Sequence, residues 1–195
     1  MGITAQDVLT AAADKYGEDQ VGAAELSQMY ESMQAMAAKK KTGVFYTPQP
    51  VAKAITRMAL EVAIGQVRPD DPGQILRIIA LDPACGCGIF LVEAAQLLAA
   101  NYAGRLFDGQ PNSAQVMAVL PTVILWSVYG IELDPVSAEL SRIALSLETG
   151  GVLTPAMLER HVIAGDTLAG ASPPALDERY PSTPQPPMDR VEVAA

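Results

Sequence analysis

Residues 82–91 decide the fold, and they run Asp82-Pro83-Ala84-Cys85-Gly86-Cys87-Gly88-Ile89-Phe90-Leu91. The stretch follows a short, isoleucine-rich apolar run at residues 75–81 and opens a helical pattern over residues 89–100. It therefore predicts a buried strand, a glycine loop and a helix in direct succession. Gly86 and Gly88 let the backbone approach a ligand without a side chain in the way, and the first turn of the helix offers free N–H groups. We expect a ligand-binding loop at the end of this strand.

The charge of this loop restricts the class of ligand. Asp82, at the tip of the strand, can accept hydrogen bonds from a cationic amine, whereas it would repel a pyrophosphate. A dinucleotide-binding loop would also need a third glycine where Leu91 stands. A plain glycine-rich turn without a ligand is the alternative. The pattern favours a cofactor that carries an amino-acid group and adenosine over a dinucleotide.

Strands alternate with helices along the rest of the chain. Further strands are expected at residues 128–133 and 161–164, a helix is expected at residues 135–148, and residues 188–195 are expected to begin a fourth strand. This alternation indicates the α/β class with an open, mainly parallel sheet, in which ligands bind at the carboxyl ends of the strands. The expected divisions are an N-terminal helical segment at 1–41, a ligand-binding domain at 42–169 and a Pro-rich tail at 170–195.

Acidic residues follow the second and third expected strands as well. Glu132 stands at the end of the second strand, where an acid can accept hydrogen bonds from both ribose hydroxyls of a nucleoside. Asp134, followed by Pro135, is instead interpreted as the N-cap of the next helix. Asp166, in Gly165-Asp166-Thr167-Leu168, follows the third strand, and a simple turn acid is the alternative for it.

A fourth element lies upstream of the glycine loop, and it reads Thr42-Gly43-Val44-Phe45-Tyr46-Thr47-Pro48. Thr47 is expected to cap a helix whose first residue is Pro48. At that helix N-terminus, the hydroxyl and backbone of Thr47 can be offered to an anionic group. Taken alone, Tyr46 would be a core residue and Thr47 only a cap.

Together these four elements, in this order over residues 42–168, resemble the cofactor-binding portion of the N6-adenine-specific DNA methyltransferases. The resemblance is strongest to the type I modification subunits and their fused type II relatives. It implies an incomplete Rossmann-like S-adenosylmethionine-dependent methyltransferase fold of three to four parallel strands, preceded by the N-terminal helical segment. Cys87 stands where family members usually have Ser or Thr, which is a small change and no sign of thiol chemistry. The residues that the resemblance implies in S-adenosylmethionine binding are Phe45, Tyr46, Thr47, Asp82, Pro83, Ala84, Gly86, Gly88, Phe90, Glu132, Leu133, Asp166, Thr167 and Leu168.

The resemblance also assigns roles within this set. Asp82 would bind the cofactor's amine, and Glu132 would hold its ribose. Asp166 would accept a hydrogen bond from the amino group of the adenine. Phe45 and Tyr46 would pack beside the cofactor.

The family's catalytic tetrapeptide, Asn/Asp-Pro-Pro-Tyr/Phe, has no match in the sequence. Ser172-Pro173-Pro174-Ala175 has the two prolines but neither the amide or acid before them nor the aromatic after them. That tetrapeptide holds the target adenine in the family. We therefore expect the chain to bind the cofactor, to contribute no catalytic residue and to be inactive alone. Further strands would then have to cover an open sheet edge and apolar helix faces.

Composition sets the expected surroundings of the chain. The 195 residues carry a formal net charge of -9, whereas a chain that wraps nucleic acid by itself is usually basic. Contact with DNA is therefore expected through a missing C-terminal part or a partner chain, and a specificity or complementing subunit is a candidate partner. Two cysteines and one histidine supply no metal-ligand set. No secretory signal or apolar run of about 18 residues is found, so a cytoplasmic protein without membrane contact is expected.

Besides part of an adenine-N6 DNA methyltransferase, two other functions remain open from the sequence. The first is a non-catalytic regulatory module that keeps the S-adenosylmethionine pocket. The second is part of a methyltransferase that acts on a non-DNA substrate, because methyltransferases with different substrates share the cofactor-binding half.

Overall fold

Three parallel strands form the sheet at the centre of the molecule. The computed structural model describes residues 2–38 and 47–179. In these parts of the chain, the sheet has the order β1-β2-β3, and its strands are β1 (Ala80–Asp82), β2 (Val128–Glu132) and β3 (Val162–Ala164). Asp82 lies opposite Gly130, and Glu132 lies opposite Ala164. The expected α/β class and parallel sheet are confirmed.

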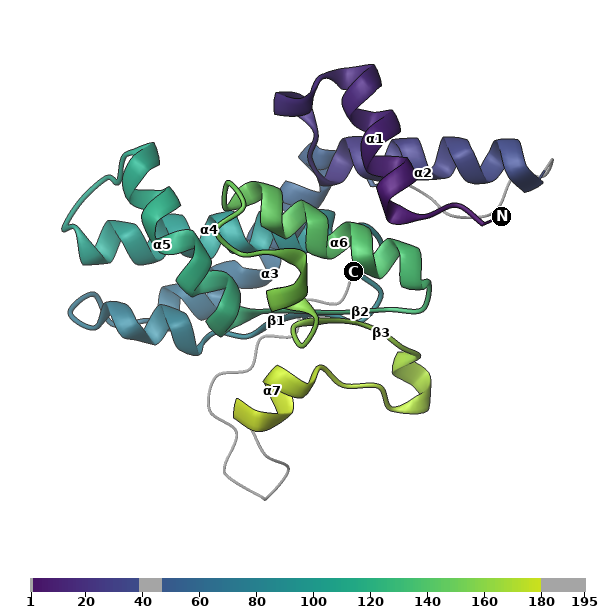
Figure 1. Ribbon diagram of the computed structural model, residues 1–195. Helices are drawn as coiled ribbons and strands as arrows, with labels where there is room; N and C mark the ends of the chain where they lie inside the picture. Colours follow the sequence, from purple (N-terminus) through teal and green to yellow (C-terminus); the bar gives the residue numbers. More distant parts are fainter. Residues whose placement is uncertain (1, 39–46, 180–195) are drawn as a thin grey trace.

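Most helices lie on one side of this sheet (Figure 1). That layer contains α3 (Gln49–Gln66), α4 (Ile89–Leu106) and α6 (Pro135–Glu148). The helix α5 (Ser113–Ser127) packs along α4. The helices α1 (Ala5–Tyr16) and α2 (Ala23–Ala38) form an outer layer that contacts α6. The short helix α7 (Pro174–Arg179) lies on the opposite side of the sheet.

Local sequence signals explain where several helices begin. Thr4 and Asp7 form a capping box at the start of α1, and Asn112 and Gln115 form another at the start of α5. Asp134 caps α6, with Pro135 as its first residue, as the sequence predicted. Short 3₁₀ helices connect the longer elements, and they are η1 (Glu18–Gln20), η2 (Pro72–Arg77), η3 (Pro155–Leu158) and η4 (Thr167–Ala169).

Some expected boundaries were wrong. The strand predicted at 75–81 begins only at Ala80, because η2 takes up the first part of the apolar run. Ile75 is fully buried in that 3₁₀ helix, so burial alone did not mark a strand. Helix α3 begins at Gln49 with Pro48, not Thr47, as its N-cap. The Pro-rich tail expected at 170–195, for which no helix was predicted, contains α7 in its described part.

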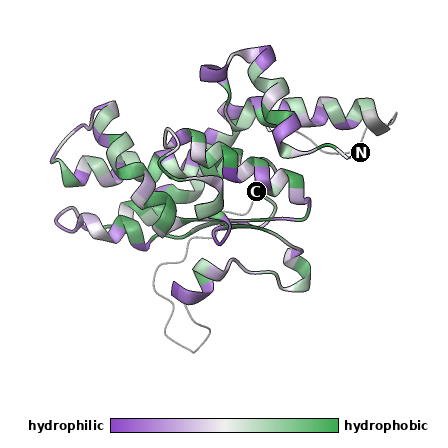
Figure 2. Cartoon of the chain, in the orientation of Figure 1, coloured by the Kyte–Doolittle hydropathy of each residue, from purple (hydrophilic) through white to green (hydrophobic). Residues whose placement is uncertain are grey.

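One hydrophobic core runs from α1 through α6 to β3. Figure 2 shows apolar residues concentrated around the sheet and the helices beside it, while the outer helices alternate between apolar and polar positions. Gly130 in β2 lies against Leu91 of α4, where a Cβ would come within 2.7 Å of the leucine methyl. The sheet and its helix layer are therefore closely packed around this strand.

Both outer strands are edges of the sheet within residues 2–38 and 47–179. One flank of α3 also exposes an apolar stripe of four side chains, namely Val51, Ile55, Met58 and Val62. The expected fourth strand at 188–195 lies outside the described residues. The division of the chain at residues 41 and 169 stays a prediction.

Candidate functional site

The loops that follow the three strands are hydrogen-bonded to one another at the carboxyl edge of the sheet. The amide of Gly86, after β1, donates to Glu132 Oε2 at the end of β2 (2.7 Å). Thr167 Oγ1, after β3, donates to the carbonyl oxygen of Pro83 (2.6 Å). The amide of Gly165 donates to the carbonyl oxygen of Glu132 (2.9 Å). Three of the four sequence elements thus form one connected group of loops, which we call the strand-end cluster (Pro83–Gly88, Glu132–Asp134 and Gly165–Leu168).

Glycine stands at positions 86 and 88 of the first loop for different structural reasons. Gly88 has φ 87°, and a Cβ there would lie 2.4 Å from Ser141 Oγ and 3.1 Å from Ser141 Cα. Gly88 is thus required where the start of α4 meets α6. Gly86 has φ 54°, but a Cβ there would meet no atom within 4 Å. Its backbone is open to a ligand, while Gly88 serves packing.

Asp82 is a buried carboxylate with one unsatisfied oxygen. The residue is only 2% exposed. Its Oδ1 accepts a hydrogen bond from the amide of Ala84 (3.0 Å). Oδ2 has no hydrogen-bond partner among the described residues. Burial raises the pKa of Asp82 to about 6, and the negative charge of Glu132 adds to this, against the lowering effect of the Ala84 amide. No cation or donor from the described residues therefore compensates Asp82 Oδ2.

Glu132 uses both of its carboxylate oxygens within the cluster. Oε2 accepts from the amide of Gly86 (2.7 Å), and Oε1 accepts from the amide of Asp134 (3.0 Å). A carboxylate has about four lone-pair positions, so two remain for a ligand. Because Glu132 is only half-buried, hydroxyl groups can reach these positions.

The third loop places a polar acceptor beside apolar surface. Asp166 is exposed, and its Oδ1 accepts from the amides of Leu168 (2.9 Å) and Ala169 (3.4 Å). The other oxygen, Oδ2, is free for a ligand among the described residues. Leu168 is 98% exposed, and Leu133 in the second loop is 72% exposed. These loops therefore offer one acceptor and two apolar side chains that could contact a flat apolar ring.

The remaining predicted site residues are placed as follows. Thr47, Pro83, Thr167 and Phe90 are half-buried, Phe90 packs against the core, and Ala84 is exposed. Gln49, in the first turn of α3, donates through Nε2 to Glu93 Oε1 of α4 (3.1 Å). The start of α3, just after Thr47, is therefore tied to α4 near its first turn. Phe45 and Tyr46 lie outside the described residues.

Sequence reasoning missed a link between the N-terminal helices and this site. The hydroxyl of Tyr30, in α2, donates to Asp134 Oδ2 (2.7 Å), which also accepts from Ser137 Oγ (2.9 Å). Burial, followed by this bond to Asp134, raises the pKa of Tyr30 to about 12. Burial alone would raise the pKa of Asp134, but the hydrogen bonds from Tyr30, Ser137 and the backbone outweigh it and hold that pKa below its usual value. The helix α2 thereby fixes the loop that carries Glu132.

Replacing Tyr30 with Phe removes this link without leaving a large cavity. We expect the free energy of unfolding to fall by about 1–2 kcal/mol, because a charge-assisted hydrogen bond is lost while Ser137 still serves the Asp134 carboxylate. Urea unfolding at pH 7 measures this. The matched control is Tyr16→Phe, whose exposed hydroxyl bonds to Gln28 Oε1 (3.2 Å). Equal effects of the two substitutions would contradict the role of Tyr30.

The two cysteines of the glycine loop are free and buried. Burial raises the pKa of Cys87 to about 11 and that of Cys85 still further. Both thiols stay protonated near neutral pH, so they are packing groups rather than nucleophiles.

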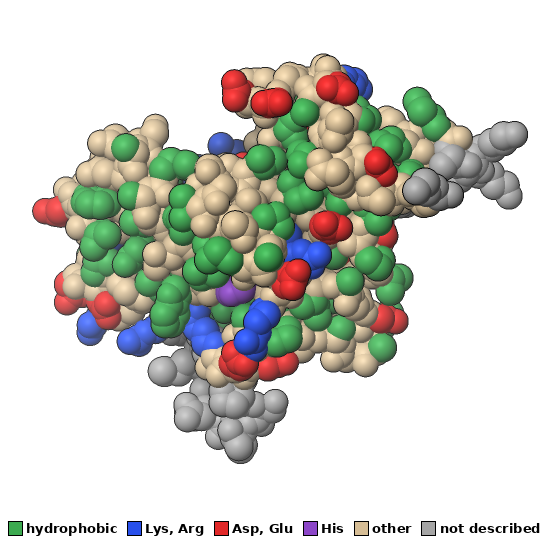
Figure 3. All heavy atoms as spheres, in the orientation of Figure 1, with side chains coloured by type: hydrophobic (Ala, Val, Ile, Leu, Met, Phe, Trp, Pro, Cys, Tyr) green, Lys and Arg blue, Asp and Glu red, His purple; other side chains and the backbone are tan. Residues whose placement is uncertain are grey.

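Three further findings concern metal ligands, membrane-spanning helices and the surface charge. Within residues 2–38 and 47–179, no group of three or more His, Cys, Asp or Glu side chains is placed to hold a metal ion. Of the helices in this described part, none combines the length and apolar character that a membrane span requires. On the face shown in Figure 3, basic side chains lie beside acidic ones instead of forming a broad basic surface.

A family model described as N-6 DNA methylase matches residues 22–173. No curated protein and no solved structure matches the chain.

Proposed function

Since the chain belongs to the N-6 DNA methylase family, we propose that it forms the S-adenosylmethionine-binding part of an adenine-N6 DNA methyltransferase of the restriction-modification type. The matched region, residues 22–173, contains the whole strand-end cluster. The proposal includes a Rossmann-like methyltransferase fold and a cytoplasmic location, which two buried free thiols fit.

The observation that carries the proposal is the unsatisfied oxygen of Asp82 in the strand-end cluster. An ammonium group would supply the donor that this buried oxygen lacks, and its positive charge would compensate for the nearby charge of Glu132. Glu132 would accept from the ribose hydroxyls through its two remaining lone-pair positions. Asp166 Oδ2 would accept from the adenine amino group, with Leu133 and Leu168 against the ring. These needs fit a ligand that combines an amino acid with adenosine.

The chemistry of the proposed reaction divides between this chain and another segment. When bound, S-adenosylmethionine supplies an electrophilic methyl group to an amine nucleophile. The residues described above would hold and orient it, and such positioning lowers the barrier to methyl transfer. Ser172-Pro173-Pro174-Ala175 lacks the groups that hold a target base. We therefore propose that catalysis and DNA contact need a further segment or a partner chain, such as a specificity or complementing subunit.

Calorimetric titration of the purified chain with S-adenosylmethionine tests this function. We expect saturable one-site binding, and we expect Glu132→Gln to weaken it about tenfold, because an amide is a poorer acceptor for ribose hydroxyls than a carboxylate. The matched control is Glu139→Gln on the exposed face of α6, which should bind like the unchanged protein. If the folded chain does not bind S-adenosylmethionine, the cofactor assignment is wrong for this chain.

A non-catalytic S-adenosylmethionine-binding module is the second candidate, and the net charge of -9 favours it. Such a module would bind the cofactor with the same residues and would not contact DNA. Addition of a chain that carries an Asn-Pro-Pro-Tyr segment discriminates between the two, because only the methyltransferase part would gain adenine methylation. A part that acts on a non-DNA substrate would methylate only a different acceptor.

A further inference from the structure

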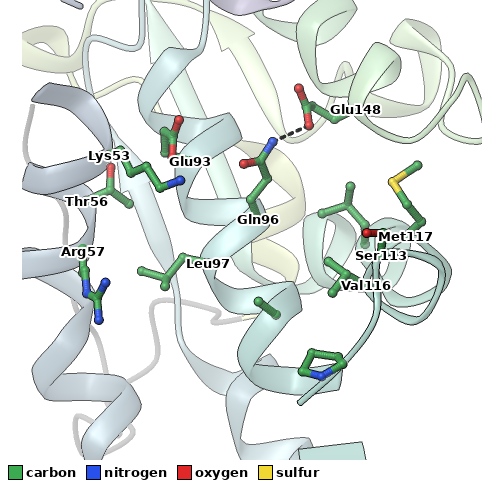
Figure 4. A pocket seen from close by; sticks show the side chains of 13 residues that line it. Lys53, Thr56, Arg57, Glu93, Gln96, Leu97, Ser113, Val116, Met117 and Glu148 are labelled. Carbon is green, nitrogen blue, oxygen red and sulfur yellow. Dashed lines mark hydrogen bonds between the residues drawn. The ribbon is translucent and has the colours of Figure 1, made fainter. Parts of the chain in front are cut away.

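A second cavity lies away from the strand-end cluster, between three helices. Its volume is about 540 Å³, and α4 forms its floor, with α3 and α5 as its walls (Figure 4). Leu97 lies at the centre of the floor, and Val116 and Met117 line the α5 wall. Lys53 and Arg57 stand on the α3 wall. The cavity therefore combines a cationic wall with an apolar floor and an apolar opposite wall.

The acidic groups of this cavity already have partners. Glu93 Oε1 accepts from Gln49 Nε2 (3.1 Å), and Glu148 Oε2 accepts from Gln96 Nε2 (2.6 Å), as the dashed line in Figure 4 shows. In Figure 4, Glu93 lies on α4 beside Lys53, whereas Glu148 lies beyond Gln96, on the side away from α3. Each is thus held by a neighbouring amide instead of by a cation of the α3 wall.

On the α3 wall, by contrast, two basic side chains are exposed to solvent without an ion-pair partner in the described chain, and one hydroxyl is buried. Neither Lys53 nor Arg57 forms an ion pair with any residue that the structure describes. Thr56, between them in sequence, is 1% exposed, and its buried Oγ1 has no hydrogen-bond partner in the described chain. A buried hydroxyl without a partner costs free energy, so a bound acceptor at this wall would be stabilised.

We propose that this cavity binds a small organic anion with an apolar body, of the class of medium-chain carboxylates. The carboxylate would lie against Lys53 and Arg57 and accept a hydrogen bond from Thr56. The apolar body would lie over Leu97 toward Met117. The volume falls within the usual range of ligand pockets, roughly 300–1,000 Å³. This site is separate from the proposed S-adenosylmethionine site and does not depend on it.

Calorimetric titration of the full chain with decanoate, and with decanol as the neutral counterpart, tests the proposal. Decanoate is expected to bind saturably, with decanol at least about tenfold weaker, because the alcohol cannot form charge-assisted hydrogen bonds with the α3 wall. Lys53→Gln and Arg57→Gln should each weaken decanoate about tenfold. Arg77→Gln, at another exposed arginine, is the matched control and should leave the affinity unchanged.

A filled cavity gives a second, independent result. Ala100→Leu, in the α4 floor, should reduce decanoate binding by at least about tenfold by occupying the space of the apolar body. Thermal unfolding of each variant establishes that it is folded. Three results would each overturn the proposal. Decanoate could fail to bind saturably, decanol could bind as tightly as decanoate, or the folded Lys53, Arg57 and Ala100 variants could bind decanoate as the unchanged protein does.

Discussion

Asp82→Asn is expected to make the ligand-free protein more stable and, at the same time, to weaken S-adenosylmethionine binding about a hundredfold. Both effects have one cause. The Asp82 carboxylate is buried beside Glu132 with Oδ2 unsatisfied, so its charge is unfavourable until a cation binds. A neutral amide of the same shape removes that penalty, but it also removes the attraction for an ammonium group.

The pH dependence of this effect follows from the direction of the pKa shift. The pKa of Asp82 is raised from 3.8 to about 6 by burial, with a contribution from Glu132. The folded protein therefore holds this proton more tightly than the unfolded chain does. The contribution of Asp82 to the free energy of unfolding is greatest below pH 3.8, and it is lost as the pH rises through about 6. Above about pH 6, this loss amounts to as much as about 3 kcal/mol.

Urea unfolding across a pH series checks this expectation. The free energy of unfolding of Asp82→Asn should exceed that of the unchanged protein at pH 8, and the two should converge at acidic pH, where the carboxyl group is neutral. Asp14→Asn on the exposed face of α1 is the control, and it should show no such pH-dependent gain. An Asp82→Asn variant that is less stable at pH 8, or that binds S-adenosylmethionine as before, would contradict the role given to Asp82.

Much of the candidate site could be predicted because the rule behind it is local. An apolar run followed by glycines marks a strand end, and parallel strands present their carboxyl ends at one edge. Asp82, Glu132 and Asp166 could therefore be assigned to one edge before their loops were seen to be hydrogen-bonded. Asp134 was also recognised as a cap, because Asp before Pro at a helix start is a local signal.

Contacts between distant segments left no such signal. Tyr30 and Asp134 are 104 positions apart, and neither the spacing nor the composition of α2 relates them. The pairing depends on how α2 packs on α6, which only the folded chain determines. Ile75 shows a related limit, because a buried apolar residue fits a 3₁₀ helix as well as a strand.

The two glycines of the loop give the last prediction, because the same substitution should mainly affect stability at Gly88 and mainly affect ligand binding at Gly86. Gly88→Ala is expected to lower the free energy of unfolding by about 3 kcal/mol or more. The new Cβ would be 3.1 Å from the backbone Cα of Ser141, which cannot move aside as a side chain end can, and φ 87° adds strain. Circular dichroism during urea unfolding measures this loss.

Gly86→Ala should cost only about 1 kcal/mol of stability, since its φ of 54° is accessible to alanine at a modest cost and its Cβ meets no atom within 4 Å. Its methyl group would instead occupy the open backbone surface, and we expect S-adenosylmethionine binding to weaken about 10- to 100-fold.

Gly65→Ala in α3, where a Cβ has free space and φ is not positive, is the control and should be slightly stabilising. If Gly86→Ala keeps full affinity while Gly88→Ala is as stable as the unchanged protein, the loop has neither the open face nor the tight packing described here. If stability and affinity are instead lost separately at the two positions, then the chain uses one glycine to hold α4 against α6 and the other to admit the ligand.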